Sequence, residues 1–195
     1  MKKLQNINST MLPLNMSNVD TDQIMPKQFL KRVERSGYGE YLFYDWKKDP
    51  SFPLNNDIYK NSKVLVAGDN FGTGSSREHA PWGLQDWGFD AIISTKFADI
   101  FRLNSINIGL LPIEASQEDV EALFNKIENN PDTKIKISVS NKSVECEDIS
   151  FLYDLDDFSQ KRILEGIDKI DITLSYEDKI ENFSNSRKSW KPKLA

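Results

Sequence analysis

The feature that most constrains this chain is an apolar segment followed directly by a glycine-rich one. Residues 64–67 read Val-Leu-Val-Ala, and residues 68–82 read Gly-Asp-Asn-Phe-Gly-Thr-Gly-Ser-Ser-Arg-Glu-His-Ala-Pro-Trp. A short apolar run bounded by glycine is typical of a buried strand, and the segment after it predicts a tight turn into a helix over about 76–87. We therefore expect a strand–turn–helix unit, a building block of α/β folds.

The residues of this turn carry groups that bind small anions. Backbone amides at a helix start favour negative charge, and Gly74 lets the backbone come close to a ligand. Arg77 has a planar guanidinium that matches a carboxylate in two hydrogen bonds, while Ser75 and Ser76 provide hydroxyls. The same residues also suit a plain helix cap, with Ser75 three positions before Glu78 as in a capping box. The chemistry of the turn alone leaves both interpretations open.

Nucleotide-binding motifs fit this turn poorly. The Rossmann pattern needs a glycine where Arg77 stands, and the Walker pattern needs a Gly-Lys-Ser/Thr ending that is absent. The chain has 195 residues, a net charge of −5, and 38% hydrophobic and 28% charged residues. This composition suits one soluble domain, residues 1–195, and disfavours a nucleic-acid or membrane partner. Because the N-terminus has no apolar signal segment, we expect a cytoplasmic protein.

Hydrophobic periodicity predicts alternating strands and helices along the chain. We expect strands at 11–17, 64–67, 91–94, 110–113, 135–139 and 144–149, the last two joined as a hairpin at 141–142. We expect helices at about 28–33, 76–87, 98–104, 117–129, 159–165 and 172–183, with a turn or helix start at 22–25 and the last two helices closing the fold. Residues 36–62 are predicted to form a long loop and residues 185–195 a tail. The alternation over 64–113 indicates an α/β core with a βαβ unit.

Three blocks in this order resemble a known family. They are residues 69–82, residues 18–30 (Asn-Val-Asp-Thr-Asp-Gln-Ile-Met-Pro-Lys-Gln-Phe-Leu), and residues 97–105 with 109–112 (Phe-Ala-Asp-Ile-Phe-Arg-Leu-Asn-Ser and Gly-Leu-Leu-Pro). Together they resemble the small, swivelling domain of the aconitase superfamily, and more narrowly the small-subunit family of 3-isopropylmalate dehydratase. Residues 37–46 are similar to the corresponding segment of the bacterial form of this subunit, which belongs to leucine biosynthesis. The resemblance implies a swivelling β/β/α domain with peripheral helices around the βαβ core.

The resemblance also implies a reaction and a partner. The family is a hydro-lyase that interconverts 2-isopropylmalate and 3-isopropylmalate through 2-isopropylmaleate. Its 4Fe–4S cluster is held by cysteine thiolates, and Cys146 is the only cysteine here. We therefore expect no metal or cofactor on this chain, and an iron–sulfur large subunit that forms a heterodimer with it and is needed for activity.

The family roles are carried over onto matching positions of this sequence. Ser75 is expected to be the base that takes and returns the substrate proton, and Arg77 to clamp the substrate carboxylate and stabilise negative charge. The other expected substrate-binding residues are Ser76, Gly74, Lys27, Gln28 and Phe29.

Three further residues have a structural and a functional interpretation. Asp20 and Asp22 would face the same way on an extended segment and suggest a pair of metal ligands. An Asp-Thr-Asp sequence before a helix is also ordinary cap chemistry, so we favour structural support at the border of the cleft. His79, the only histidine, titrates near neutrality, but a lone histidine one turn into a helix is more often a hydrogen-bonded structural residue.

The identity of the substrate is less constrained than the family. Related small subunits act on citraconate or 2-methylmalate, or are of the homoaconitate type, and the loop over about 29–43 is expected to discriminate between them. A stand-alone anion-binding regulatory module is the alternative from another functional class.

Overall fold

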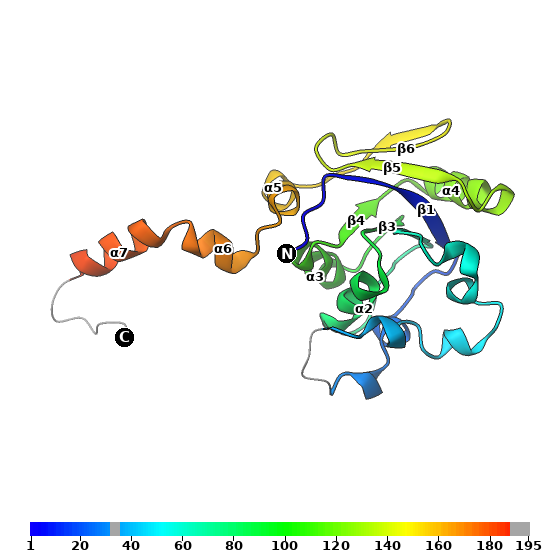
Figure 1. The fold of residues 1–195 in the computed structure, drawn as a ribbon, viewed down its shortest axis with the longest axis horizontal. Helices are drawn as coiled ribbons and strands as arrows, with labels where there is room; N and C mark the ends of the chain where they lie inside the picture. The colour runs from blue at the N-terminus through cyan, green and yellow to red at the C-terminus, as the bar shows by residue number, and fades with distance from the viewer. Residues whose placement is uncertain (32–35, 188–195) are drawn as a thin grey trace.

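The computed structural model describes residues 1–31 and 36–187 of the chain. Seven strands form one mixed sheet, in the spatial order β4-β3-β2-β1-β5-β6-β7 (Figure 1). Their bounds are β1 Asn6–Leu14, β2 Val64–Ala67, β3 Ala91–Ser94, β4 Leu111–Glu114, β5 Lys134–Ser138, β6 Ser143–Cys146 and β7 Ile149–Leu152. Strands β1 to β4 pair in parallel, and β5 to β7 continue the sheet with antiparallel pairing. The expected α/β class with a βαβ core is confirmed.

Strand β1 joins the two halves of the sheet. Its first part, Asn6–Thr10, pairs antiparallel with β5, and its second part, Met11–Leu14, pairs in parallel with β2. The strand predicted at 11–17 is therefore wrong at both ends, because β1 begins at Asn6 and ends at Leu14. Its early half alternates exposed Asn6 and Asn8 with buried Ile7, and pairing with a strand more than a hundred residues away extends it.

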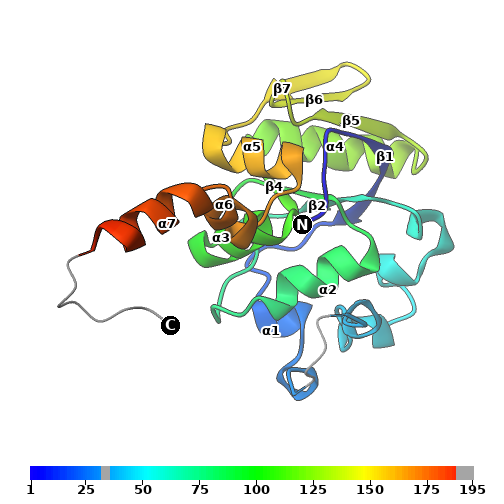
Figure 2. The same ribbon diagram turned by 60° about the vertical axis from the view of Figure 1, so that its left-hand side comes forward.

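Buried side chains form two cores on opposite faces of the sheet. Along β2, Val64 and Val66 belong to one core, whereas Leu65 and Ala67 belong to the other, as the two-residue period of a strand requires. Helix α4 (Gln117–Asn129) supplies four apolar side chains at helical spacing to the first core. Helices α2 (His79–Trp87) and α3 (Asp99–Ile108) cover the second core. Figure 2 shows β2 and β4 between α4 and α2.

The predicted long loop is irregular and well packed. Its four short 3₁₀ turns are Gly39–Tyr41, Trp46–Lys48, Pro53–Asn55 and Asp57–Tyr59. Tyr38, Leu42 and Phe43 at its start are fully buried in the second core. Burial of large side chains contributes about 1.5–3 kcal/mol each, so this segment is part of the folded body.

Two predictions about the later part of the chain are wrong. The strand predicted at 144–149 is two strands, because Glu147 takes a left-handed backbone conformation with φ of 53° and starts a turn between β6 and β7. The helix predicted at 172–183 is also two helices, α6 (Lys169–Leu174) and α7 (Glu177–Ser186).

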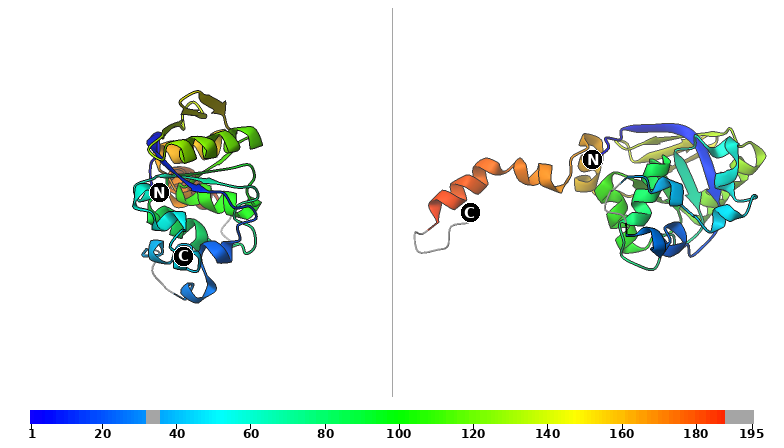
Figure 3. Two further views of the ribbon diagram at one scale, coloured as in Figure 1. Left: turned by 90° about the vertical axis from the view of Figure 1, so that its right-hand side faces the viewer. Right: turned by 60° about the horizontal axis from the view of Figure 1, so that its bottom comes forward.

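Of the two helices predicted to close the fold, the one at 159–165 packs on the body and the one at 172–183 does not. Helix α5 (Asp157–Glu165) buries Ile163 in the first core, whereas α6 and α7 bury no side chain and extend away from the body (Figure 3). Residues 188–195 of the predicted tail lie outside the described ranges. In residues 1–31 and 36–187, none of the helices is long and apolar enough to cross a membrane.

Candidate functional site

The candidate site is the loop that connects β2 to α2. Helix α2 begins at His79, and its N-cap Glu78 makes no side-chain capping hydrogen bond. The predicted helix start at residue 76 and the capping box at Ser75 are therefore wrong, and the residues from Ser75 to Arg77 precede the helix. Pro81 fits the first turn of the shorter helix because no backbone N–H is needed there.

Segment 19–21 holds this loop through the backbone. The amides of Gly72 and Thr73 donate to the carbonyl of Val19 at 2.8 and 3.1 Å, and the amide of Thr21 donates to the carbonyl of Thr73 at 2.8 Å. Gly72 and Gly74 have φ of 80° and 91°, where glycine avoids the strain of a side chain. The first two sequence blocks thus lie side by side in the fold.

Thr21 is a site residue that the sequence reasoning missed. Its hydroxyl accepts a hydrogen bond from the Ser75 amide at 3.0 Å and donates one to the Ser75 carbonyl at 3.2 Å. That carbonyl also accepts from the Arg77 amide at 2.8 Å. The side-chain hydroxyl of Ser75 makes no hydrogen bond within the described ranges. The only sequence signal for Thr21 is its place between Asp20 and Asp22.

Asp20 and Asp22 do not lie on an extended segment. Asp20 is the N-cap of α1 (Thr21–Ile24): its carboxylate accepts from the Asp22 amide at 2.6 Å, and Gln23 completes a capping box. The same carboxylate lies against Gly74, where an added Cβ atom would overlap it. Asp22 instead faces the cations of the site, so the two carboxylates have separate partners and form no ligand pair.

Asp22 lies between two positive charges. Its Oδ1 forms an ion pair with Nη1 of Arg77, and its Oδ2 lies 3.1 Å from Nζ of Lys27. The Arg77 side chain is 26% exposed and that of Lys27 is 70% exposed. Arg77 is thus held in place, while Lys27 is only loosely fixed at the rim.

The third sequence block reaches the same loop. Asn104 of α3 donates through Nδ2 to the carbonyl of Ser76 at 3.4 Å. Ser76 is exposed, and Ser75 and Arg77 are partly exposed. All three blocks that carry the family resemblance therefore meet at Ser75–Arg77.

Gln28 and Phe29 are less closely connected to this centre. Gln28 is exposed. The ring of Phe29 stacks on Tyr41 with 4.2 Å between ring centroids and meets Tyr44 edge-on at 4.9 Å. Residues 32–35 of the expected specificity loop lie outside the described ranges.

His79 packs as an aromatic ring. Its centroid lies 5.4 Å from that of Tyr38 and 4.7 Å from that of Trp82. Its Nδ1 is buried and has no hydrogen-bond partner in residues 1–31 and 36–187, so a hydrogen-bonded structural role through this nitrogen stays a prediction. Burial and the charge of Arg77 lower the pKa of His79, partly offset by Glu78, which keeps the ring neutral at pH 7.

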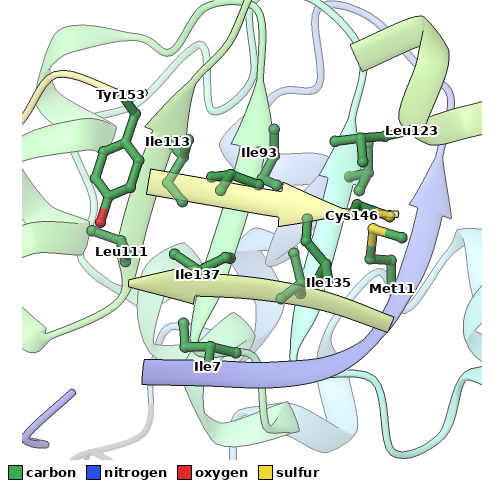
Figure 4. Packing of buried hydrophobic residues seen from close by; sticks show 14 of the residues in the cluster. Ile7, Met11, Ile93, Leu111, Ile113, Leu123, Ile135, Ile137, Cys146 and Tyr153 are labelled. Carbon is green, nitrogen blue, oxygen red and sulfur yellow. The ribbon is translucent and has the colours of Figure 1, made fainter. Parts of the chain in front are cut away.

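The residues of this chain do not fit an iron–sulfur cluster. Cys146 is 1% exposed in the first core (Figure 4), and burial raises the pKa of its thiol. In the described part of the chain, no three His, Cys, Asp or Glu side chains are grouped to hold a metal. A cluster needs several thiolates, and the whole sequence contains one cysteine.

Comparison with known proteins decides the family. The Aconitase C-terminal domain family matches residues 1–118. The 3-isopropylmalate dehydratase small subunit of Corynebacterium jeikeium is 47% identical over 193 residues, which cover 99% of this chain and 98% of that protein. This chain belongs to the family of 3-isopropylmalate dehydratase small subunits.

A second small subunit is close in sequence, and a solved structure shares the fold at lower identity. The 3-isopropylmalate dehydratase small subunit of Mycolicibacterium vanbaalenii is 49% identical over 181 residues, covering 93% of this chain and 92% of that protein. The crystal structure of 3-isopropylmalate dehydratase from Methanocaldococcus jannaschii superimposes with a TM-score of 0.66 at 26% identity, covering 91% of this chain and 98% of that chain. The expected family and aconitase-type fold are confirmed.

Proposed function

We propose that this chain is the small subunit of a 3-isopropylmalate dehydratase, which interconverts 2-isopropylmalate and 3-isopropylmalate through 2-isopropylmaleate in the cytoplasm. The observation that carries this proposal is the 47% identity to a small subunit of that name along 99% of the chain. An iron–sulfur large subunit would be the partner, because one buried cysteine cannot hold the cluster.

Arg77 would bind a carboxylate of the substrate. Its guanidinium can offer two parallel hydrogen bonds to a carboxylate, which a lysine cannot reproduce. Within the described ranges this side chain donates one hydrogen bond, from Nη1 to Asp22, which would leave other N–H donors for a substrate carboxylate. Lys27 would add positive charge at the rim, with Ser76, Gly74, Gln28 and Phe29 lining the substrate region.

Ser75 would move the proton. As an alkoxide, its Oγ takes the proton from the carbon beside the bound carboxylate, and the electrons of that C–H bond form the double bond as hydroxide leaves the neighbouring carbon. Addition of water reverses these steps, with the proton returned by Ser75. A serine needs nearby positive charge to act as a base, and Arg77, two residues away, supplies it. Departure of the hydroxide belongs to the large subunit.

The test is reconstitution without oxygen. The purified chain is mixed with a cluster-loaded large subunit and 3-isopropylmalate, and the absorbance of isopropylmaleate is followed. We expect activity in the mixture and none from either subunit alone. A known small subunit with the same large subunit is the positive control.

Other results would redirect the proposal. Activity on citraconate or a homoaconitate-type substrate, with none on isopropylmalate, would assign a related hydro-lyase. No activity on any of these, while the control pair works, would favour a binding module.

A further inference from the structure

We infer that Thr21 is a positioning residue for Ser75, whose hydroxyl fixes the direction in which the Ser75 side chain leaves the backbone. This inference rests on the proposed function, since the position of Ser75 matters only if it handles the proton. It assigns a role in the reaction to a buried residue outside the glycine-rich loop.

The geometry that supports it is a two-point contact. Thr21 Oγ1 accepts from the Ser75 amide at 3.0 Å and donates to the Ser75 carbonyl at 3.2 Å. The amide belongs to the peptide before Ser75, and the carbonyl to the peptide after it. Holding both peptide planes restricts φ and ψ of Ser75, and these two angles set the direction of its Cα–Cβ bond. The Ser75 hydroxyl itself is not used for this contact.

Thr21 is itself well anchored. It is 2% exposed, its amide donates to the Thr73 carbonyl at 2.8 Å, and its carbonyl accepts from the Met25 amide at 2.9 Å. A β-branched side chain also has few accessible rotamers. The hydroxyl is therefore a fixed point, whereas Ser75 alone lies in a loop without regular secondary structure.

The next residue of α1 holds the other expected catalytic group. Asp22 forms the ion pair with Arg77, so consecutive residues of one helical turn hold Ser75 and Arg77. The amide of Arg77 also donates to the Ser75 carbonyl at 2.8 Å, so this carbonyl accepts from both Thr21 and Arg77. Thr21 and Asp22 together set the base and the carboxylate clamp relative to each other.

The experiment compares three variants in the complex with the large subunit. Thr21→Val keeps the shape and removes the hydroxyl, Thr21→Ser keeps the hydroxyl, and Thr10→Val is the matched control. The control removes the Thr10 hydroxyl, which lies on β1 and hydrogen-bonds the Ser62 hydroxyl at 2.9 Å, away from the site. Misplacing a reacting group by about 1 Å costs on the order of 100-fold in rate, so we expect kcat of Thr21→Val to fall by about that factor. KM should stay within about twofold because the carboxylate contacts remain, and Thr21→Ser and Thr10→Val should stay near wild type.

A second measurement does not depend on catalysis, and its wild-type arm does not depend on a variant that folds. In the isolated full chain, the Ser75 amide should exchange with deuterium slowly, and faster in Thr21→Val. Exchange of the wild-type amide at the rate of an unstructured peptide would overturn the inference.

The outcomes separate the two proposals. An inactive wild-type complex, with the control pair working, would overturn the proposed function and this role for Thr21 with it. An active wild-type complex with unchanged kcat in Thr21→Val would overturn the inference alone.

Discussion

Asp22 and Arg77 form an ion pair although 55 positions separate them in the sequence. Asp22 lies on α1, and Arg77 lies in the loop after β2. A guanidinium can form two parallel hydrogen bonds to a carboxylate only when its plane is correctly oriented. The contact of Asp22 with Nη1 restricts the orientation of the Arg77 guanidinium. If Arg77 binds a substrate carboxylate as proposed, this pair would orient its guanidinium for that second carboxylate.

Arg77→Lys should lower kcat/KM by about 100-fold, the order found when a fixed donor to developing charge is removed. Lysine keeps the charge but presents a single ammonium group. Steady-state kinetics of the reconstituted complex measure this change. Arg102→Lys is the matched control, because the Arg102 side chain lies 4.0 Å from Glu114 in a weak surface pair. Full activity of Arg77→Lys would disprove the clamp.

Ser75→Ala should lower kcat by about 100- to 10,000-fold, the usual contribution of a positioned acid–base group. Association with the large subunit, measured by gel filtration, should not change. Ser76→Ala is the neighbouring comparison, and it should raise KM more than it lowers kcat if Ser76 only binds substrate. Normal turnover of Ser75→Ala would rule out Ser75 as the base.

Gly74→Ala should destabilise the protein by about 1–3 kcal/mol, with loss of activity. Gly74 has φ of 91°, and the added Cβ would overlap the Asp20 carboxylate. Gly88→Ala separates backbone strain from overlap with a neighbouring side chain. Gly88 has φ of 124°, so alanine is strained there too, but no atom lies within 4 Å of its Cβ position. Urea unfolding and kinetics of both variants are the measurement. Equal activity of the two variants would contradict a specific contact at Gly74.

His79 should titrate below its usual value of about 6.5, because burial and then Arg77 lower its pKa. The unfolded chain then binds more protons than the folded one as the pH falls below that value. The neutral His79 therefore contributes to the free energy of unfolding above the pKa of histidine in the unfolded chain. This contribution is lost as the pH falls toward the lower pKa of the folded chain. NMR of the single histidine measures the pKa directly.

The matching stability experiment compares wild type with His79→Gln, since titration of the carboxylates is common to both. The free energy of unfolding of wild type should fall relative to that of the variant between pH 7.5 and pH 5.5. A histidine pKa at or above 6.5 would contradict the buried, neutral ring.

Cys146 should resist thiol reagents in the folded protein at pH 7. It is 1% exposed, so a reagent cannot reach the sulfur. Burial also raises the pKa of the thiol, so little reactive thiolate forms at pH 7. Mass spectrometry after iodoacetamide treatment should find no adduct on the native chain and one adduct in denaturant. Rapid native labelling would mean that the first core opens readily.

Elements whose signals are local can be predicted from the amino-acid sequence alone. Four consecutive apolar residues predict β2, and apolar side chains at helical spacing predict α4 with the bounds observed. The family could also be inferred from the three ordered blocks, because glycine turns and their neighbours have strict residue requirements. The number of cysteines, likewise a property of composition, already limits what metal site this chain can hold.

Strand pairing and side-chain contacts between residues far apart in the chain depend on the tertiary structure. The early half of β1 exists because β5 pairs with it, and the hydrogen bonds from Thr21 to the backbone of Ser75 link segments 54 positions apart. The apolar residues of α6 and α7 predict packing, yet neither helix has a buried side chain in the described part of the chain. The pairing of Asp22 with Arg77 has no signal in either segment alone, since a contact across 55 positions forms only when both elements are in place.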